Sequence, residues 1–254
     1  MANPTIRVRS RSDGRASPAI DGQPIQNEIL LSLPPKECEL IFPRLTFIDL
    51  RAYDVLHEPG EPIKFGYLLN TGMVSVLSVL SDGKSVEVGL TGREGFVGLP
   101  LIVGFSTSPT RAVVQIDGTA FRVPSREMVQ LIRQCPILAN RLQRYVQLLA
   151  MQGTQVAACN RLHEVDERLA RWLLMCQDRI DSHLVPLTQE FLAHMLGTRR
   201  ASVTVAAGML QKAGLITYQR GHVKIVDRTQ LEGAACECYE IMQQQDKKWR
   251  NESA

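Results

Sequence analysis

The chain contains 254 residues, of which 44% are hydrophobic, and its formal net charge is +3; this is enough apolar material for one large or two ordinary packed domains. No segment approaches the roughly 18 consecutive apolar residues of a membrane span, and residues 1–27 are too polar for a secretory signal. The sequence therefore argues against a membrane-spanning or secreted protein and predicts a folded, cytoplasmic one.

The cysteines are scattered along the sequence. They are Cys38, Cys135, Cys159, Cys176, Cys236 and Cys238. None forms a Cys-x-x-Cys pair or a Cys/His spacing typical of zinc sites, so the pattern predicts no metal and no iron–sulfur cluster. The Cys236-Glu237-Cys238 segment allows a redox-sensing pair, but two ordinary reduced thiols are the favoured interpretation.

Residues 1–27 are rich in Arg, Ser, Pro, Gly and Asp and carry few large apolar side chains. Such a segment cannot offset the entropy lost on ordering, so it is predicted to be a flexible tail. Short helices are expected at 28–33 and 35–42. They open a sensor domain that is predicted to extend over 28–135.

Turn signals and alternating apolar residues over 45–124 indicate an antiparallel β-roll. The turn signals are the segments 58–62, 70–72, 81–84 and 117–119, which contain Gly, Asn, Asp or Pro. Val86, Val88 and Leu90 alternate with Ser85, Glu87 and Gly89, and Ala112, Val114 and Ile116 alternate with Val113 and Gln115. This period of two predicts strands with one buried and one exposed face.

From Ser125 the apolar period becomes helical. A short helix should end near Cys135, because Pro136 disfavours helical backbone in the residue before it. A long helix is predicted over 136–163. It carries a stripe at 4-3-4-3-4 spacing formed by Leu138, Leu142, Tyr145, Leu149, Gln152 and Val156. This spacing is the seam of a coiled-coil homodimer, and a helix that packs the stripe against its own domain is the alternative.

An amphipathic helix over 165–179 and a connector over 180–185 lead to a helix-turn-helix pattern in the domain 164–230. Thr188 suits an N-cap, and a first helix can run to Leu196. A helix-turn-helix needs a residue with left-handed backbone in the turn and a cap for the second helix, and Gly197 and Thr198 suit these places. It also needs a small residue where the helices cross and an aliphatic side chain between them, and Ala193 and Val203 suit those.

The second helix begins with two arginines. Arg199 and Arg200 face the positive end of the helix dipole, which costs roughly 0.3–1 kcal/mol each. Between Leu187 and Lys224 there are five basic residues and one acidic residue. DNA contact explains this choice better than a solvated surface does, because arginine can pair with guanine or with phosphate.

Two short strands follow, at 215–218 and 223–226, joined across 219–222. A basic hairpin after a helix-turn-helix is a wing, and its cations Arg220, His222 and Lys224 are expected to touch phosphates. The tail over 231–254 is predicted to be helical through Gln245, and no role is assigned to it.

On these motifs, over about 28–228, the chain resembles the Crp/Fnr family of bacterial transcription regulators. The segment GLITYQRGHVKIV at 214–226, the helix-turn-helix and the segment 92–98 carry the resemblance. It implies an α+β fold with a β-roll like a cyclic-nucleotide-binding jelly roll, a dimerisation helix and a winged helix-turn-helix. By position it implies phosphate contacts from Thr188, Gln189, Arg199 and Ser202, beside Thr198, and a base contact from Arg200. Ala201 and Val205 depart from the family's usual Glu and Arg, so the preferred DNA site should differ from the best-known consensus.

Family members that bind cyclic AMP carry Gly-Glu for the ribose and Arg-Ser/Thr-Ala for the phosphate. The matching positions are Gly98, Leu99, Thr110 and Arg111, which mark a possible effector pocket. Because the ribose carboxylate is missing, ordinary cyclic-AMP recognition is not expected, and no cofactor is predicted. Arg111 could still meet an anion, or it could be an ordinary strand-end arginine. His57 is interpreted as a turn residue rather than a haem ligand.

No nucleophile elbow, P-loop, dinucleotide fingerprint or metal constellation indicates an enzyme. The expected partners are double-stranded DNA, a second copy of the chain, RNA polymerase and an unidentified small-molecule effector. The alternative is a ligand-binding signalling module that acts through protein partners. That alternative gives no reason for a basic helix and a basic wing in one domain.

Overall fold

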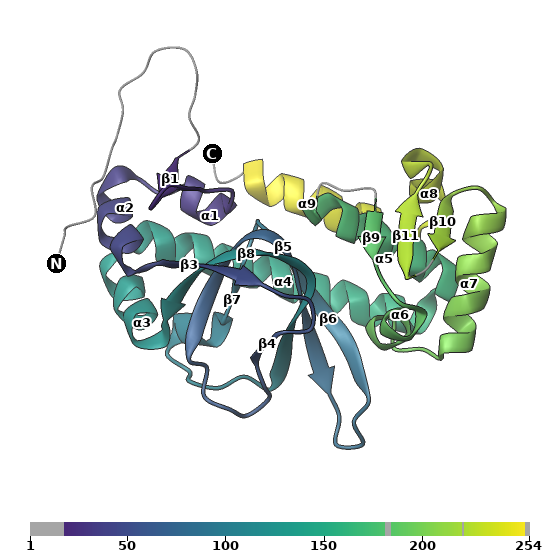
Figure 1. Cartoon of the computed structure of the whole chain (residues 1–254), viewed down its shortest axis with the longest axis horizontal. Helices are drawn as coiled ribbons and strands as arrows, with labels where there is room; N and C mark the ends of the chain where they lie inside the picture. Colours follow the sequence, from purple (N-terminus) through teal and green to yellow (C-terminus); the bar gives the residue numbers. More distant parts are fainter. Residues whose placement is uncertain (1–17, 181–183, 220, 252–254) are drawn as a thin grey trace, which may run out of the picture.

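The computed structural model describes residues 18–180, 184–219 and 221–251. A β-roll, the long helix α4 (Pro136–Leu162) running along it, and a helical domain with a small sheet near the end of α4 make up the molecule (Figure 1). Within the described ranges, no helix is long and apolar enough to cross a membrane.

Part of the predicted flexible tail is ordered, so that prediction is wrong for residues 18–27. Strands β1 (Ala19–Ile20) and β2 (Gln23–Pro24) form a hairpin. Ile20 and Ile25 are buried in the core of the roll, which anchors a segment that is otherwise polar. Residues 1–17 lie outside the described residues. The helices α1 (Glu28–Leu31) and α2 (Pro35–Ile41) and the 3-10 turn η1 (Phe42–Arg44) follow.

The roll is an antiparallel six-stranded sheet. Its strands are β3 (Thr46–Leu50), β4 (Val55–His57), β5 (Phe65–Val79), β6 (Ser85–Thr91), β7 (Phe96–Val97) and β8 (Thr110–Pro124). The order is β3-β8-β5-β6, while β4 pairs with β8 and β7 pairs with β5. The two 15-residue strands, β5 and β8, pair along most of their length and form the framework of the roll.

Two of the four predicted turns are wrong, because 70–72 lies inside β5 and 117–119 lies inside β8. The pairing of these strands shifts register here. Gly72 has a φ of +76°, and a Cβ on Gly118 would collide with the backbone of Thr71. The glycines therefore serve a bulge and a close backbone approach. The other two turns are confirmed by Gly60 and Gly83, which both have positive φ.

The strands predicted to be half-buried are covered on both faces. In β6, Glu87 and Gly89 are buried as well as Leu90. Helices pack on the second face: Leu149 of α4 lies over Gly89, and Trp172 contacts Glu87. Alternation of apolar and polar residues indicates that one face of a strand is buried. It does not show whether a helix packs on the other face.

The helix α3 (Ser125–Gln134) precedes α4. The stripe predicted as a dimer seam packs within the chain: Leu138, Leu142, Tyr145 and Val156 are buried, and Leu149 and Gln152 are partly buried. Tyr145 Oη donates a hydrogen bond to Thr91 Oγ1 at 2.9 Å, which ties the helix to the roll. The alternative interpretation, a stripe that packs against its own chain, therefore describes the four buried residues, and Leu149 and Gln152 remain partly exposed.

The C-terminal domain contains α5 (Val165–Ile180), β9 (Leu184–Pro186), α6 (Gln189–Met195), α7 (Arg200–Lys212), β10 (Ile216–Gln219), β11 (His222–Ile225), α8 (Arg228–Ala234) and α9 (Cys238–Asn251). The sheet order is β10-β11-β9. The predicted connector thus contains a strand that the sequence pattern did not show. Helix α9 packs against α4 and α5 and extends the helical tail to Asn251.

Candidate nucleic-acid interface

Helices α6 and α7 form the predicted helix-turn-helix. Thr188 caps α6, since its hydroxyl accepts a hydrogen bond from the Phe191 N–H at 3.2 Å. Gly197 adopts the left-handed backbone of the turn, with a φ of +57°. Ala193 and Val203 are buried where the helices meet. Each of these features follows the residue types that the motif requires.

The expected Thr198 cap of the second helix is wrong, because Arg199 is the N-cap residue of α7 and makes no side-chain capping bond. The Thr198 N–H still bonds to the Ala193 carbonyl at 3.0 Å, so this residue closes the first helix. The chain enters α7 one residue later than predicted.

Arg199 and Arg200 are both exposed at the N-terminal end of α7. Within the described part of the chain, neither guanidinium makes a hydrogen bond or an ion pair. Their charges oppose the helix dipole, and no carboxylate of the described residues forms an ion pair with either of them. Such a placement costs stability and leaves two cations available for an external anion.

The outward face of α7 is only partly polar. Val205 is 63% exposed and Met209 is 53% exposed, and Ala201 and Thr204 are exposed beside them. The Thr204 hydroxyl lies 2.8 Å from Gln189 Oε1, which connects the outer faces of α6 and α7. In a major groove, an exposed aliphatic side chain can contact the methyl group of thymine, while the amide N–H of Gln189 remains able to donate to phosphate.

The hairpin of β10 and β11 forms the predicted wing, with Gln219 opposite His222. His222 and Lys224 are exposed on it, and Ser202 of α7 is partly exposed. Arg220, which was also predicted to touch phosphates, lies outside the described residues. The Tyr218 hydroxyl donates to the Leu187 carbonyl at 3.1 Å, so the wing is anchored at the start of α6.

Two polar contacts join the roll to α5. In the first, Trp172 Nε1 of α5 donates to Glu87 Oε1 of β6 at 2.8 Å, while Ser75 Oγ of the roll donates to Glu87 Oε2 at 2.7 Å. Burial raises the pKa of Glu87 to about 7, although these hydrogen bonds oppose the shift. The helix-turn-helix touches the roll as well: Phe191 packs edge-on against Tyr53 with ring centroids 6.0 Å apart.

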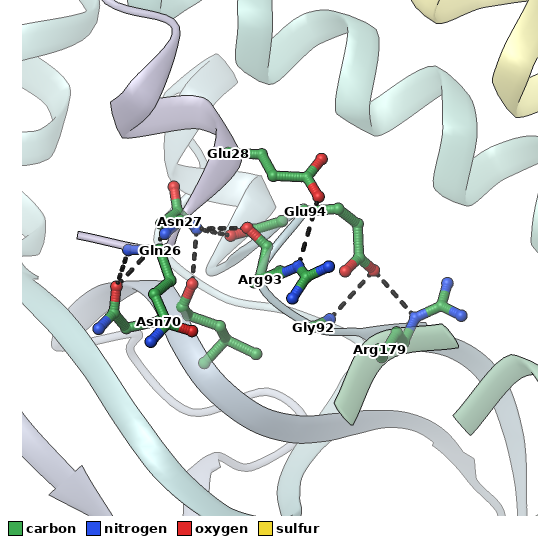
Figure 2. Close-up of polar contacts among 10 residues, drawn as sticks. Gln26, Asn27, Glu28, Asn70, Gly92, Arg93, Glu94 and Arg179 are labelled. Atoms are coloured by element: carbon green, nitrogen blue, oxygen red, sulfur yellow. Dashed lines mark hydrogen bonds and ion pairs between the residues drawn. The ribbon is translucent and has the colours of Figure 1, made fainter. Parts of the chain in front are cut away.

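Figure 2 shows the second contact, where the turn at 92–95 meets α1 and α5. Arg179 forms an ion pair with Glu94 at 2.9 Å whose side chains are 10% and 14% exposed, and Glu94 also accepts the Gly92 N–H at 3.0 Å. Asn27 places its amide within 3.1 Å of three backbone carbonyls of β5 and this turn. The turn at 92–95, within the segment 92–98 whose role the sequence did not explain, is therefore the joint between the roll and α5.

The four residues of the possible effector pocket do not form an open anion site. Gly98 has a φ of +108° and begins the 3-10 helix η2 (Leu99–Val103). Arg111 Nε pairs with Glu58 Oε2 at 2.8 Å, and Thr110 bonds to Ser108 at 2.8 Å. The arginine that would meet a cyclic phosphate is thus already neutralised by a carboxylate of the same chain.

The fold also brings together four residues whose spacing in the sequence predicted no metal site. Cys159, His163, Cys236 and Cys238 place their ligand atoms within 4.8 Å of one another. The sequence separation between Cys159 and Cys236 is 77 residues. Local motifs cannot report such a group, because it exists only after α9 has packed beside α4.

Two family models match this chain, one in the helix-turn-helix region and one in the roll. A model described as a Crp-like helix-turn-helix domain matches residues 167–234, and one described as a cyclic nucleotide-binding domain matches residues 47–135. No curated protein matches the chain by sequence.

Solved structures show the same fold at low identity. FixK2 from Bradyrhizobium japonicum is 18% identical with a TM-score of 0.65, covering 76% of this chain and 98% of its own. The c-di-GMP-responsive global regulator CLP from Xanthomonas campestris is 16% identical with a TM-score of 0.64, covering 76% and 100%. A CRP-family transcriptional regulator from Thermus thermophilus is 22% identical with a TM-score of 0.60, covering 74% and 96%.

Proposed function

The chain belongs to the Crp/Fnr family of transcription regulators, and from this we propose that it binds a palindromic DNA operator as a homodimer. Helix α7 would lie in the major groove with its N-terminal residues at the base edges. The observation that carries the proposal is the pair Arg199 and Arg200, exposed at that end without a partner among the described residues. These two cations lower the stability of the free protein, and they contribute favourable free energy when they bind the phosphates or bases of DNA.

The contacts divide into two classes. Arg200, in the first turn of α7, would read a base, and Val205 further along the helix would contact an apolar base edge. Thr188, Gln189, Thr198, Arg199 and Ser202, together with His222, Lys224 and Arg220 of the wing, would bind phosphates. Phosphate contacts position the protein, so sequence preference should depend on few residues.

The dimer needs a surface other than the buried stripe. A neighbouring side of α4, about 100° round the helix from the stripe, exposes Val146, Ala150 and Ala157, with Gly153 partly exposed between them. Small side chains at this spacing let two helices approach closely. A two-fold axis along this face would present two copies of α7 to half-sites about one helical turn apart.

Effector control would pass through the joint between roll and α5. An effector that shifts the turn at 92–95 would move Arg179, and one that shifts β6 would move Trp172. Cyclic AMP is not the proposed effector, because Leu99 provides no carboxylate for ribose and Arg111 is paired with Glu58. RNA polymerase remains the expected protein partner.

The first test is selection of bound duplexes from a random DNA library at two salt concentrations. The wild-type protein should enrich a palindrome, and Arg199→Ala/Arg200→Ala should lose it. The matched control is Arg126→Ala/Arg133→Ala, which removes two exposed arginines from α3 of the roll. If the control variant also lost the palindrome, the loss would come from the lower net positive charge and not from the positions of Arg199 and Arg200. Enrichment of no sequence by the wild type would favour the protein-binding alternative.

Sedimentation of the wild type and Ala150→Arg tests the dimer. The variant should shift toward the monomer and bind half-sites more weakly, because it places a cation at the centre of the paired face. Gln130→Arg on the exposed side of α3 is the control. An unchanged dimer in Ala150→Arg would place the interface elsewhere.

A further inference from the structure

Four potential metal ligands meet where α4 ends and α9 begins. The thiols of Cys159 and Cys236 are 3.4 Å apart, and Cys238 Sγ is 3.5 Å from His163 Nδ1. All four ligand atoms lie within 4.8 Å of one another. The three cysteines are buried, and His163 is partly exposed, which leaves an entry path for an ion.

The donor set and its size favour one tetrahedral ion. Three thiolates and one imidazole form a common structural zinc site, with bonds of about 2.3 Å to sulfur and about 2.1 Å to nitrogen. Ligands at those distances around one ion are separated by about 3.4–3.8 Å, which is close to the separations found here. An iron–sulfur cluster would hold its thiolates farther apart, because bridged irons lie between them.

Two buried arginines beside the group point to a negative charge there. Arg168 and Arg171 of α5 are 6% and 2% exposed, and the Nε atom of each has no hydrogen-bond partner among the described residues. Arg168 Nη2 donates to Asn160 Oδ1 at 2.9 Å, next in the chain to Cys159, and to the Leu196 carbonyl, and neither of these partners carries a charge. Arg171 lies near Glu87, but burial raises the pKa of that carboxyl to about 7, so it is not a full countercharge at neutral pH.

A buried guanidinium without an anion is costly. Three thiolates and a neutral imidazole around a divalent cation carry a net charge of −1, which would supply the anion that the arginines lack. Two other features fit bound thiolates. Gln155 Nε2 donates to Cys238 Sγ at 3.2 Å. Cys238 is also the first residue of α9, where the helix dipole stabilises negative charge.

We propose that Cys159, His163, Cys236 and Cys238 bind one Zn²⁺ ion that fastens the C-terminal helix to the end of α4. The three thiols release three protons, and the neutral imidazole donates a lone pair, so the site changes from four neutral ligands to a monoanionic complex. The metal links residues that lie on either side of the helix-turn-helix and wing. It therefore fixes the DNA-binding domain to the helix that follows the sensor.

The test is metal binding by the full-length chain, reduced, stripped with a chelator and then titrated with Zn²⁺. One equivalent should bind tightly, and Co²⁺ should give the visible absorption of tetrahedral thiolate coordination. Cys236→Ala and His163→Ala should weaken binding at least tenfold. His163→Cys, which retains four ligands, should keep the ion. Cys176→Ala is the matched control, because Cys176 is a buried cysteine of the same domain outside the group.

The alternative outcome is a disulfide between Cys159 and Cys236. Failure of the reduced wild-type protein to bind Zn²⁺, together with detection of this disulfide by thiol alkylation and mass spectrometry in the protein as purified, before reduction, would overturn the proposal. Binding that survives in Cys236→Ala would overturn it as well. Because the wild-type titration is read directly, a variant that fails to fold does not decide the result. DNA binding does not enter these measurements.

Discussion

Two arginines of the roll and its joint differ from two arginines of the helix-turn-helix in how their charge is balanced. In the roll and its joint, Arg111 is paired with Glu58 and Arg179 is paired with Glu94. In the helix-turn-helix, Arg199 and Arg200 have no such partner among the described residues. An arginine that is already balanced by a carboxylate has less to gain from an external phosphate. From this comparison we expect anion recognition at Arg199 and Arg200, whereas Arg111 and Arg179 stabilise the fold.

The largest expected effect is the loss of a balanced charge in the joint. Arg179→Met should lower the free energy of unfolding by about 3–5 kcal/mol, because Glu94, whose side chain is only 14% exposed, is left without its partner. Urea unfolding measures this change. Glu94→Gln/Arg179→Met should recover most of it, since no charge is then stranded, and Arg126→Met on the surface should have little effect. A change below about 1 kcal/mol would mean that solvent reaches the pair.

Glu87 gives a pH dependence to the same joint. Its pKa is raised from 4.5 to about 7 in the folded chain, so between these values the folded state binds a proton that the unfolded state has released. The free energy of unfolding should therefore fall as pH rises from about 4.5 to about 7, by on the order of 3 kcal/mol, and change no further from this group at higher pH.

Urea unfolding of Glu87→Gln at pH 5 and pH 8 isolates this contribution. The variant keeps a neutral group that can accept the Trp172 hydrogen bond, so its loss of stability between the two pH values should be smaller than that of the wild type. Exposed Glu61→Gln is the control and should follow the wild type. Identical pH profiles for Glu87→Gln and the wild type would contradict the prediction.

The unpaired arginines predict a smaller effect on stability, with the opposite sign. Arg199→Ala/Arg200→Ala should leave the fold intact or stabilise it by roughly 0.3–1 kcal/mol per residue, because each cation opposes the dipole of α7. Thermal unfolding at low ionic strength measures this gain, and added salt should reduce it. A destabilised variant would mean that the two side chains support the fold.

The sequence predicted the helix-turn-helix well because its requirements are local. A cap at Thr188, a left-handed Gly197 and a wedge at Val203 each follow from one residue type at one position. Thr198 failed as a cap because the end of α6 still holds its backbone. Strand β9 was missed because three residues are too few for a periodic signal.

Long-range packing is what the sequence could not show. Gly72 and Gly118 were interpreted as turns, yet they allow β5 and β8 to bend together. The stripe on α4 has the spacing of a dimer seam, and only the structure shows that the roll covers it. The Cys159 group likewise depends on α9 returning to α4.

The smallest expected effect concerns Arg111. Glu58→Gln removes its ion-pair partner. The side chains of Arg111 and Glu58 are 37% and 34% exposed, so the free energy of unfolding should change by less than about 1 kcal/mol. Cyclic AMP at millimolar concentration should bind neither this variant nor the wild type in calorimetry, because the ribose carboxylate is still missing. Glu58→Gln/Leu99→Glu supplies that carboxylate and frees the arginine, and it should bind more tightly than either single variant. Saturable binding to the wild type would instead show that phosphate can displace Glu58, and the roll would then resemble the DNA-binding half in holding a charge for a ligand.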